Sequence, residues 1–141
     1  MNARDISGAL EQTACHPDSA FASSELVDQW TAQDVGEEAI EPILRFMETH
    51  PAIDYGTPGP LVHFVEKFPP DVRETELLRS LERRPTAHTA WMLHRVINGT
   101  AGTARRSALR EALNRAKSHP KVDALAIELI DDLFSDPESD S

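Results

Sequence analysis

The sequence predicts an all-α protein, a short right-handed solenoid of helix-turn-helix units about 34 residues long. Four prolines recur at intervals of 34, 34 and 35 residues: Pro17, Pro51, Pro85 and Pro120. Three apolar residues precede each of the last three prolines at the same offsets, and no segment alternates as a strand does. We therefore expect one helical-repeat domain over residues 1–134 and a disordered acidic tail at residues 135–141.

The three apolar triplets carry the argument for a repeat. They are Ile43, Leu44 and Met47; Leu77, Leu78 and Leu81; and Ala112, Leu113 and Ala116. Their offsets place three side chains on one helical face, just before a proline that ends the helix. A stack of HEAT-like or TPR-like helix pairs would bury Leu44, Leu78 and Leu113 at equivalent positions.

The first predicted helices have weak sequence signals. We expect a weak helix over residues 5–14, then a helix that is capped by Ser23 or Ser24 and runs through Trp30. Proline lacks the backbone N–H that a helix interior requires. Pro42 therefore predicts that the third helix is either kinked or begins one residue before this proline.

A turn-rich loop is predicted over residues 54–60, because glycine and proline crowd it. Pro60 suits the first turn of the fourth helix, where its missing N–H costs nothing. Asp71 should cap a fifth helix that continues to Arg83.

Residues 85–99 read as a complete helix with its own start and stop signals. Thr86 can cap the beginning, and Gly99 can end it in the left-handed conformation. A buried stripe recurs at helical spacing: Thr89, Ala90, Leu93, Val96 and Ile97. Trp91 and Arg95 lie four residues apart beside this stripe, so their side chains should touch.

The last two helices differ in charge. A basic helix over residues 104–118 carries four arginines: Arg105, Arg106, Arg110 and Arg115. Since no aromatic residue interleaves with them, we interpret them as a solvated face or as partners of nearby acids, not as a phosphate site. Pro120 or Lys121 should open the final helix, with Leu125 among its inward residues.

Charge is distributed unevenly over the 141 residues, whose net charge is −10. Residues 1–69 carry −9, residues 70–123 carry +5 and residues 124–141 carry −6. Acidic surface repels nucleic acid and attracts a basic protein partner, although it also serves solubility alone. Apolar runs too short for a bilayer, no signal pattern and a single cysteine predict a cytoplasmic protein that neither binds nor crosses membranes.

The histidines do not form a recognisable catalytic or metal site. His88 and His94 are six residues apart and do not share one helical face, as a zinc pair would. His63 and Glu66 could form an acid–base pair, but a polar seam on an exposed helix face is the simpler interpretation. No phosphate loop or serine elbow occurs, so we expect no enzyme activity, no metal and no cofactor; a hydrolase using His63 and His94 is the least favoured alternative.

Two segments carry a resemblance to a known class of proteins. They are residues 54–63 (Asp-Tyr-Gly-Thr-Pro-Gly-Pro-Leu-Val-His) and residues 91–98 (Trp-Met-Leu-His-Arg-Val-Ile-Asn), together with Pro85 and Thr86. Over residues 40–134 the chain resembles small helical immunity proteins of bacterial polymorphic toxin and contact-dependent inhibition systems. The resemblance implies a HEAT-like, non-enzymatic inhibitor of a cognate toxin domain. The acidic charge of residues 1–69 makes a nuclease one candidate for that toxin, because a nuclease presents a basic cleft to phosphate.

The resemblance supplies no binding residues, because these differ between lineages of such proteins. From exposure and clustering we expect the partner to contact six residues: Asp54, Tyr55, His63, Glu66, Trp91 and Arg95. The alternative function is a general helical-repeat scaffold or adaptor whose partner is not a toxin.

Overall fold

In a computed structural model, which describes residues 3–50 and 59–135, every regular element is helical. The elements are α1 (Ala3–Ala14), α2 (Ser19–Ala32), the 3₁₀ turn η1 (Glu37–Ala39), α3 (Ile40–Thr49), α4 (Pro60–Glu66), α5 (Pro70–Arg83), α6 (Ala87–Asn98), α7 (Thr103–Arg115), the 3₁₀ turn η2 (Ala116–Ser118) and α8 (Ala124–Ser135). The all-α prediction is therefore confirmed for this part of the chain. No helix within these ranges is long and apolar enough to span a bilayer.

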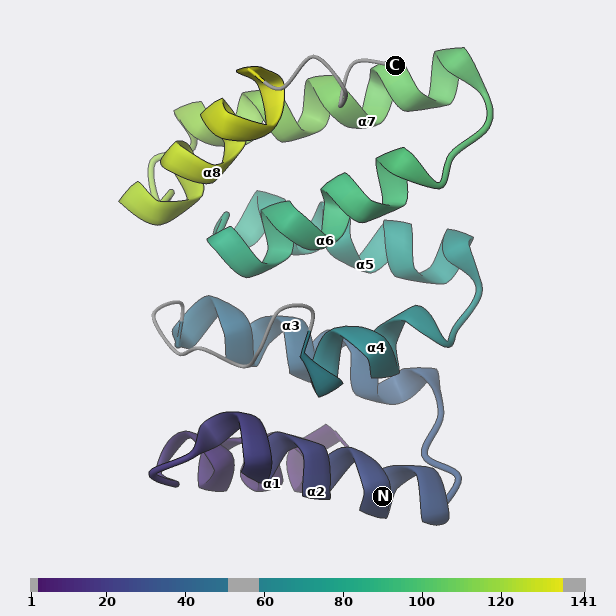
Figure 1. The fold of residues 1–141 in the computed structure, drawn as a ribbon, viewed down its shortest axis with the longest axis vertical. Coiled ribbons are helices and arrows are strands. Elements are labelled where there is room, and N and C mark those ends of the chain that lie inside the picture. Colours follow the sequence, from purple (N-terminus) through teal and green to yellow (C-terminus); the bar gives the residue numbers. More distant parts are fainter. Residues whose placement is uncertain (1–2, 51–58, 136–141) are drawn as a thin grey trace. The chain divides into compact units, whose positions relative to one another are not determined.

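The chain packs as two compact units, residues 1–73 and residues 74–141, with the boundary inside α5. In the first unit α1 packs against α2 and α3, and α2 packs against α4 (Figure 1). In the second unit α6 packs against both α7 and α8. The single domain predicted over residues 1–134 stays a prediction, and residues 136–141 of the predicted tail lie outside the described residues.

The first unit has an aromatic centre. The Trp30 side chain on α2 is completely buried, and its ring centre lies 5.3 Å from that of Phe64 on α4. Other residues without solvent exposure complete this core: Ile6, Leu10, Ile40, Ile43, Leu44, Met47, Leu61 and Val65. The predicted burial of the first apolar triplet is thus confirmed.

The second unit has an aliphatic core. One cluster joins α5, α6, α7, η2 and α8: Leu81, Ala90, Leu93, Ile97, Leu109, Leu113, Ala116 and Ile130. Leu113 is 1% exposed, as predicted, but Leu78 is only partly buried at the edge of the cluster. The prediction of equivalent burial for Leu44, Leu78 and Leu113 is therefore wrong at Leu78.

Two helix starts differ in how well the sequence predicted them. The second helix begins at Ser19, not at Ser23 or Ser24, because Asp18 caps it by accepting from the Phe21 N–H at 3.0 Å. Ser23 instead lies buried within α2. Pro42 occupies the first turn of α3, which confirms the predicted start just before this proline.

The start signal of α6 is confirmed. Thr86 Oγ1 accepts from the Thr89 N–H, and Thr89 Oγ1 accepts from the Thr86 N–H, both at 3.2 Å. Both side chains are fully buried, so each satisfies a backbone donor that has no access to water. The predicted stop is wrong in its geometry, because Gly99 has φ −90° and is not left-handed.

Proline and aspartate set the remaining starts. Pro60 opens α4 as predicted, and α5 begins at Pro70, which leaves Asp71 within the first turn. The last helix begins at Ala124, because Asp123 accepts from the Ala126 N–H at 2.8 Å and caps it. This start differs from the one predicted near Pro120.

The end of α2 offers a test of backbone strain. Asp34 has φ 57°, while Val35 N donates to Trp30 O at 2.9 Å and Asp34 N donates to Thr31 O at 3.2 Å. This is the Schellman arrangement, whose left-handed position favours glycine. We expect Asp34→Gly to raise the free energy of unfolding by about 0.5–1 kcal/mol and Asp34→Ala to lower it. Urea denaturation would contradict this if the glycine variant unfolded at a lower concentration than the native chain.

Candidate functional site

The predicted contact residues form two local pairs within the described residues. On α4, His63 Nδ1 lies 3.9 Å from Glu66 Oε1, with the two side chains 64% and 20% exposed. On α6, the Arg95 guanidinium lies 5.0 Å from the centre of the Trp91 ring, as the spacing predicted. The first pair belongs to the first unit and the second pair to the second unit. Asp54 and Tyr55 lie outside the described residues.

The exposed surface of α2 is acidic around one aromatic side chain. Asp18, Phe21, Glu25 and Asp28 follow one another at intervals of three, four and three residues, which places them on one side of the helix. Phe21 is 54% exposed, and all three acids are exposed as well. We call these four residues the α2 acidic face.

Two features suit the α2 acidic face to protein binding. Glu25 and Asp28 form no ion pair with any residue that the structure describes, so both charges remain available. An exposed aromatic ring ringed by charge is the usual composition of an interface anchor. The His16 ring, 6.3 Å from the Phe21 ring, supports it from the turn between α1 and α2.

A shallow depression of about 290 Å³ borders this face. Residues of α1, α2 and the turn between them line it: Ala9, Gln12, Thr13, His16, Ala22, Glu25, Leu26 and Gln29. Glu25 belongs both to the depression and to the α2 acidic face. A side chain that contacts Phe21 therefore has a recess of mixed polar and apolar lining beside it.

Sequence reasoning missed the α2 acidic face because it placed the start of this helix at Ser23. Phe21 then fell outside any helix, and its relation to Glu25 was not apparent. Asp18 could have indicated the true start of the helix, because aspartate is a favoured N-cap residue. Phe21, Glu25 and Asp28 then follow it at intervals of three, four and three residues.

Three histidines immediately precede a proline, at positions 16, 50 and 119, and the rings of His16 and His119 accept a hydrogen bond from the backbone two residues on. His16 Nδ1 accepts from the Asp18 N–H at 2.9 Å, and His119 Nδ1 accepts from the Lys121 N–H at 2.9 Å. The histidine ring thus closes the turn around the proline in both places. Because Nδ1 of His119 is an acceptor, its ring hydrogen lies on Nε2.

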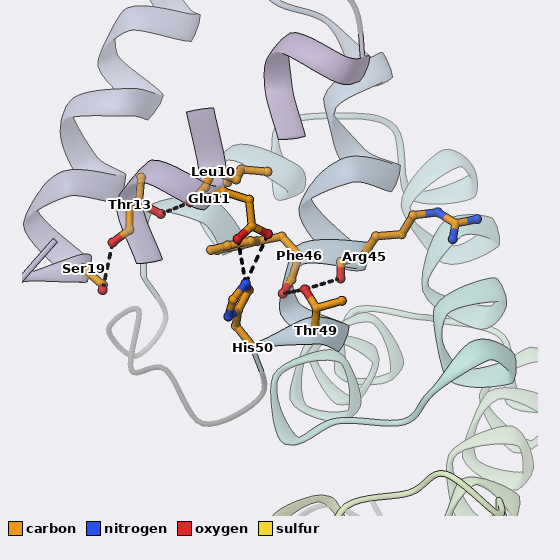
Figure 2. Close-up of polar contacts among 8 residues, drawn as sticks. All are labelled: Leu10, Glu11, Thr13, Ser19, Arg45, Phe46, Thr49 and His50. Carbon is orange, nitrogen blue, oxygen red and sulfur yellow. Dashed lines mark hydrogen bonds and ion pairs between the residues drawn. The ribbon is translucent and has the colours of Figure 1, made fainter. Parts of the chain in front are cut away.

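The histidines after α3 and after η2 also contact an earlier helix of their own unit. His119 Nε2 donates to the Glu82 carbonyl oxygen at 2.6 Å, near the C-terminal end of α5. His50 Nε2 lies 3.0 Å from a Glu11 carboxylate oxygen on α1, and the centre of the His50 ring lies 4.8 Å from that of Phe46 (Figure 2). The contacting residues are 37 and 39 positions apart in sequence.

A second candidate surface lies in the second unit. A groove of about 440 Å³ runs between α5 and α7, with an apolar floor and charged groups along it. Its lining is Leu78, Leu81, Glu82, Arg105, Ala108, Leu109, Ala112, Arg115, Ala116 and His119. Arg105 pairs with Glu74 on α5, as expected for an arginine beside neighbouring acids, whereas Arg115 forms no ion pair within the described residues. We call this the α5–α7 groove.

The described residues hold no group of three histidine, cysteine, aspartate or glutamate side chains placed to share a metal ion. The pKa of one carboxyl, Glu38, is lowered because the backbone N–H groups of Glu38 and Gly36 donate hydrogen bonds to it. Glu38 is fully exposed at η1, where this bonding stabilises a turn. The expected absences of a metal and of catalysis stay predictions.

Comparison of the chain with protein-family models, with curated proteins and with solved structures finds no match. Function is therefore inferred from the charge and shape of its own surfaces.

Proposed function

We propose that this protein is a cytoplasmic immunity protein, which binds a cognate bacterial toxin domain and neutralises it by occlusion. The α2 acidic face carries the proposal, because it combines an exposed aromatic ring with three exposed acids. The net charge of −9 over residues 1–69 places this face in a strongly acidic part of the chain. A basic protein surface is the complementary partner.

The proposed mechanism is electrostatic mimicry followed by desolvated contact. A toxin that acts on nucleic acid must present basic side chains to phosphate groups. Glu25 and Asp28 would meet such a cleft, and opposite potentials would speed the encounter. Burial of Phe21 in the complex would slow dissociation, since buried aromatic anchors dominate interface energies.

We also propose that the helices form a HEAT-like or TPR-like repeat of helix pairs. Pro17, Pro51, Pro85 and Pro120 follow α1, α3, α5 and η2, so each proline separates the two members of a pair. Packing of α1 on α3 and of α2 on α4 supports stacked pairs in the first unit. The backward contacts of His50 and His119 support the same repeat in each unit.

The proposal predicts that a neighbouring gene encodes a toxic domain, and it is tested with that domain. We expect the native chain to restore growth of cells that express that domain and to bind it with an association rate that falls as salt rises. Glu25→Lys with Asp28→Lys should slow association about tenfold with little change in the thermal melt. The matched control is Glu37→Lys with Glu111→Lys, which makes the same change in net charge at exposed acids outside α2.

Two results would count against this mechanism. Equal effects of both double variants would mean that net charge matters and the α2 acidic face does not. Absence of any complex with the neighbouring gene product would favour the adaptor alternative.

Phe21→Ala should mainly raise the dissociation rate of the complex, which separates the aromatic contact from the electrostatic one.

A further inference from the structure

The α5–α7 groove leaves apolar side chains uncovered in the second unit. Leu78 is only partly buried, whereas Leu44 and Leu113, which occupy the same place in their apolar triplets, are 0% and 1% exposed. Two small side chains, Ala108 and Ala112, line its α7 side and leave room there. Its volume of about 440 Å³ falls within the ~300–1,000 Å³ of typical binding pockets, so it can accept incoming side chains.

The last helix presents the complementary surface. Leu125 is 53% exposed on α8, and Glu128 and Asp132 lie three and seven residues further on along the same side. The helix contains Glu128, Asp131 and Asp132 but no basic residue. This surface is therefore an acidic face with one exposed leucine, which we call the α8 face.

We propose that two copies of this chain form a dimer, in which the α8 face of each copy occupies the α5–α7 groove of the other. Leu125 would lie over Leu78 and the two alanines, and Glu128 would meet Arg115. Both surfaces belong to the second unit, so one two-fold axis can generate both contacts at once. Such an isologous contact closes on itself and does not propagate.

Charge and hydrophobicity favour a second copy as the occupant. The occupant needs an apolar side chain to cover Leu78 and a carboxylate to pair with Arg115. The α8 face provides both, in Leu125 and Glu128. Arg115 has no ion-pair partner among the described residues of its own chain. The contact is small, so we expect a dimer that forms at micromolar concentrations or above.

Sedimentation velocity on the full chain, from about 1 to about 500 μM, tests the dimer. We expect a monomer–dimer equilibrium that shifts toward monomer as salt rises. Leu125→Glu should raise the dimer dissociation constant at least tenfold, because it removes the apolar contact. Phe21→Ala is the matched control and should leave this constant unchanged, because Phe21 is the other large exposed hydrophobic residue among those that the structure describes.

A charge exchange identifies the two surfaces. Arg115→Glu alone and Glu128→Arg alone should each weaken the dimer about tenfold, since each places like charges opposite one another. An equimolar mixture of the two variants should recover the native dissociation constant, because both contacts of the mixed dimer again join opposite charges. Thermal melts of the separate variants should match the native melt, since both positions are exposed.

Several outcomes would overturn this inference. A chain that stays monomeric up to about 500 μM would exclude a second copy as the occupant. Growth beyond a dimer would exclude reciprocal exchange, and failure of the mixture to recover would exclude the pairing of Arg115 with Glu128. Each of these results can be obtained without the toxin, so it is independent of the proposed function.

Discussion

Trp30→Ala should lower the free energy of unfolding by about 3–5 kcal/mol, the range for removal of a buried aromatic side chain. Trp30 is completely buried on α2, and its ring packs against Phe64 of α4 at 5.3 Å between centres. The alanine variant would lose this contact and leave a cavity between the two helices. Chemical denaturation followed by circular dichroism measures the loss.

Trp30→Phe is the informative control for this prediction. The Trp30 indole N–H is buried and has no hydrogen-bond partner within the described structure. Phenylalanine removes this unpaired donor and keeps an aromatic ring against Phe64, so the two effects oppose each other. We expect a cost of less than about 1.5 kcal/mol. A loss as large as that of the alanine variant would show that the indole has a partner.

Leu113→Ala should cost about 2–5 kcal/mol, because Leu113 is 1% exposed within the aliphatic core of the second unit. Leu78→Ala should cost less than half as much, since Leu78 is only partly buried at the edge of the same core. The same substitution thus compares two positions of the apolar triplets. Thermal melts at low concentration, where the proposed dimer dissociates, measure both.

Equal losses at the two positions would contradict this burial pattern and restore the equivalence that the sequence predicted. Leu129→Ala is an additional control, because Leu129 is another half-buried residue packed against the cluster. It should resemble Leu78→Ala more than Leu113→Ala.

The sequence predicted the helices well because their signals are local. Thr86 accepts a hydrogen bond from a backbone N–H in the first turn of α6, and Pro60 has no N–H that would need a partner in the first turn of α4. The predicted starts of both helices are confirmed. Burial depends on neighbours that are distant in sequence, which explains the errors at Leu78 and Leu125. The spacing of these leucines does not reveal that α5 and α7 leave a groove beside Leu78 or that Leu125 is 53% exposed among the described residues.

The helix ends show a second limit of sequence reasoning. Gly99 was expected in the left-handed conformation, but in the structure Asp34 adopts it. Asp34 follows α2 whereas Gly99 follows α6, and aspartate adopts this region far less readily than glycine, so residue type alone did not indicate Asp34. Asp18 was similarly overlooked in favour of two serines that were equally good caps by residue type.

The candidate site was predicted only in part. Contact between Trp91 and Arg95 and proximity of His63 to Glu66 follow from helical spacing, and the structure has both. The position of Phe21 on the exposed side of α2 could be predicted only once the first residue of this helix was known. Recognition of the α2 acidic face in the sequence therefore depended on one capping residue, Asp18.

The buried hydroxyl pair at the start of α6 restricts how this chain can change in length. Thr86 and Thr89 satisfy one another's backbone donors without access to water, which fixes the first residue of the helix. An inserted residue before Thr86 can be absorbed in the connection from α5. One inserted after Thr89 would rotate Leu93 and Ile97 by about 100° away from the core. Insertions and deletions should therefore accumulate on the N-terminal side of this pair during evolution, and not within the helix that follows it.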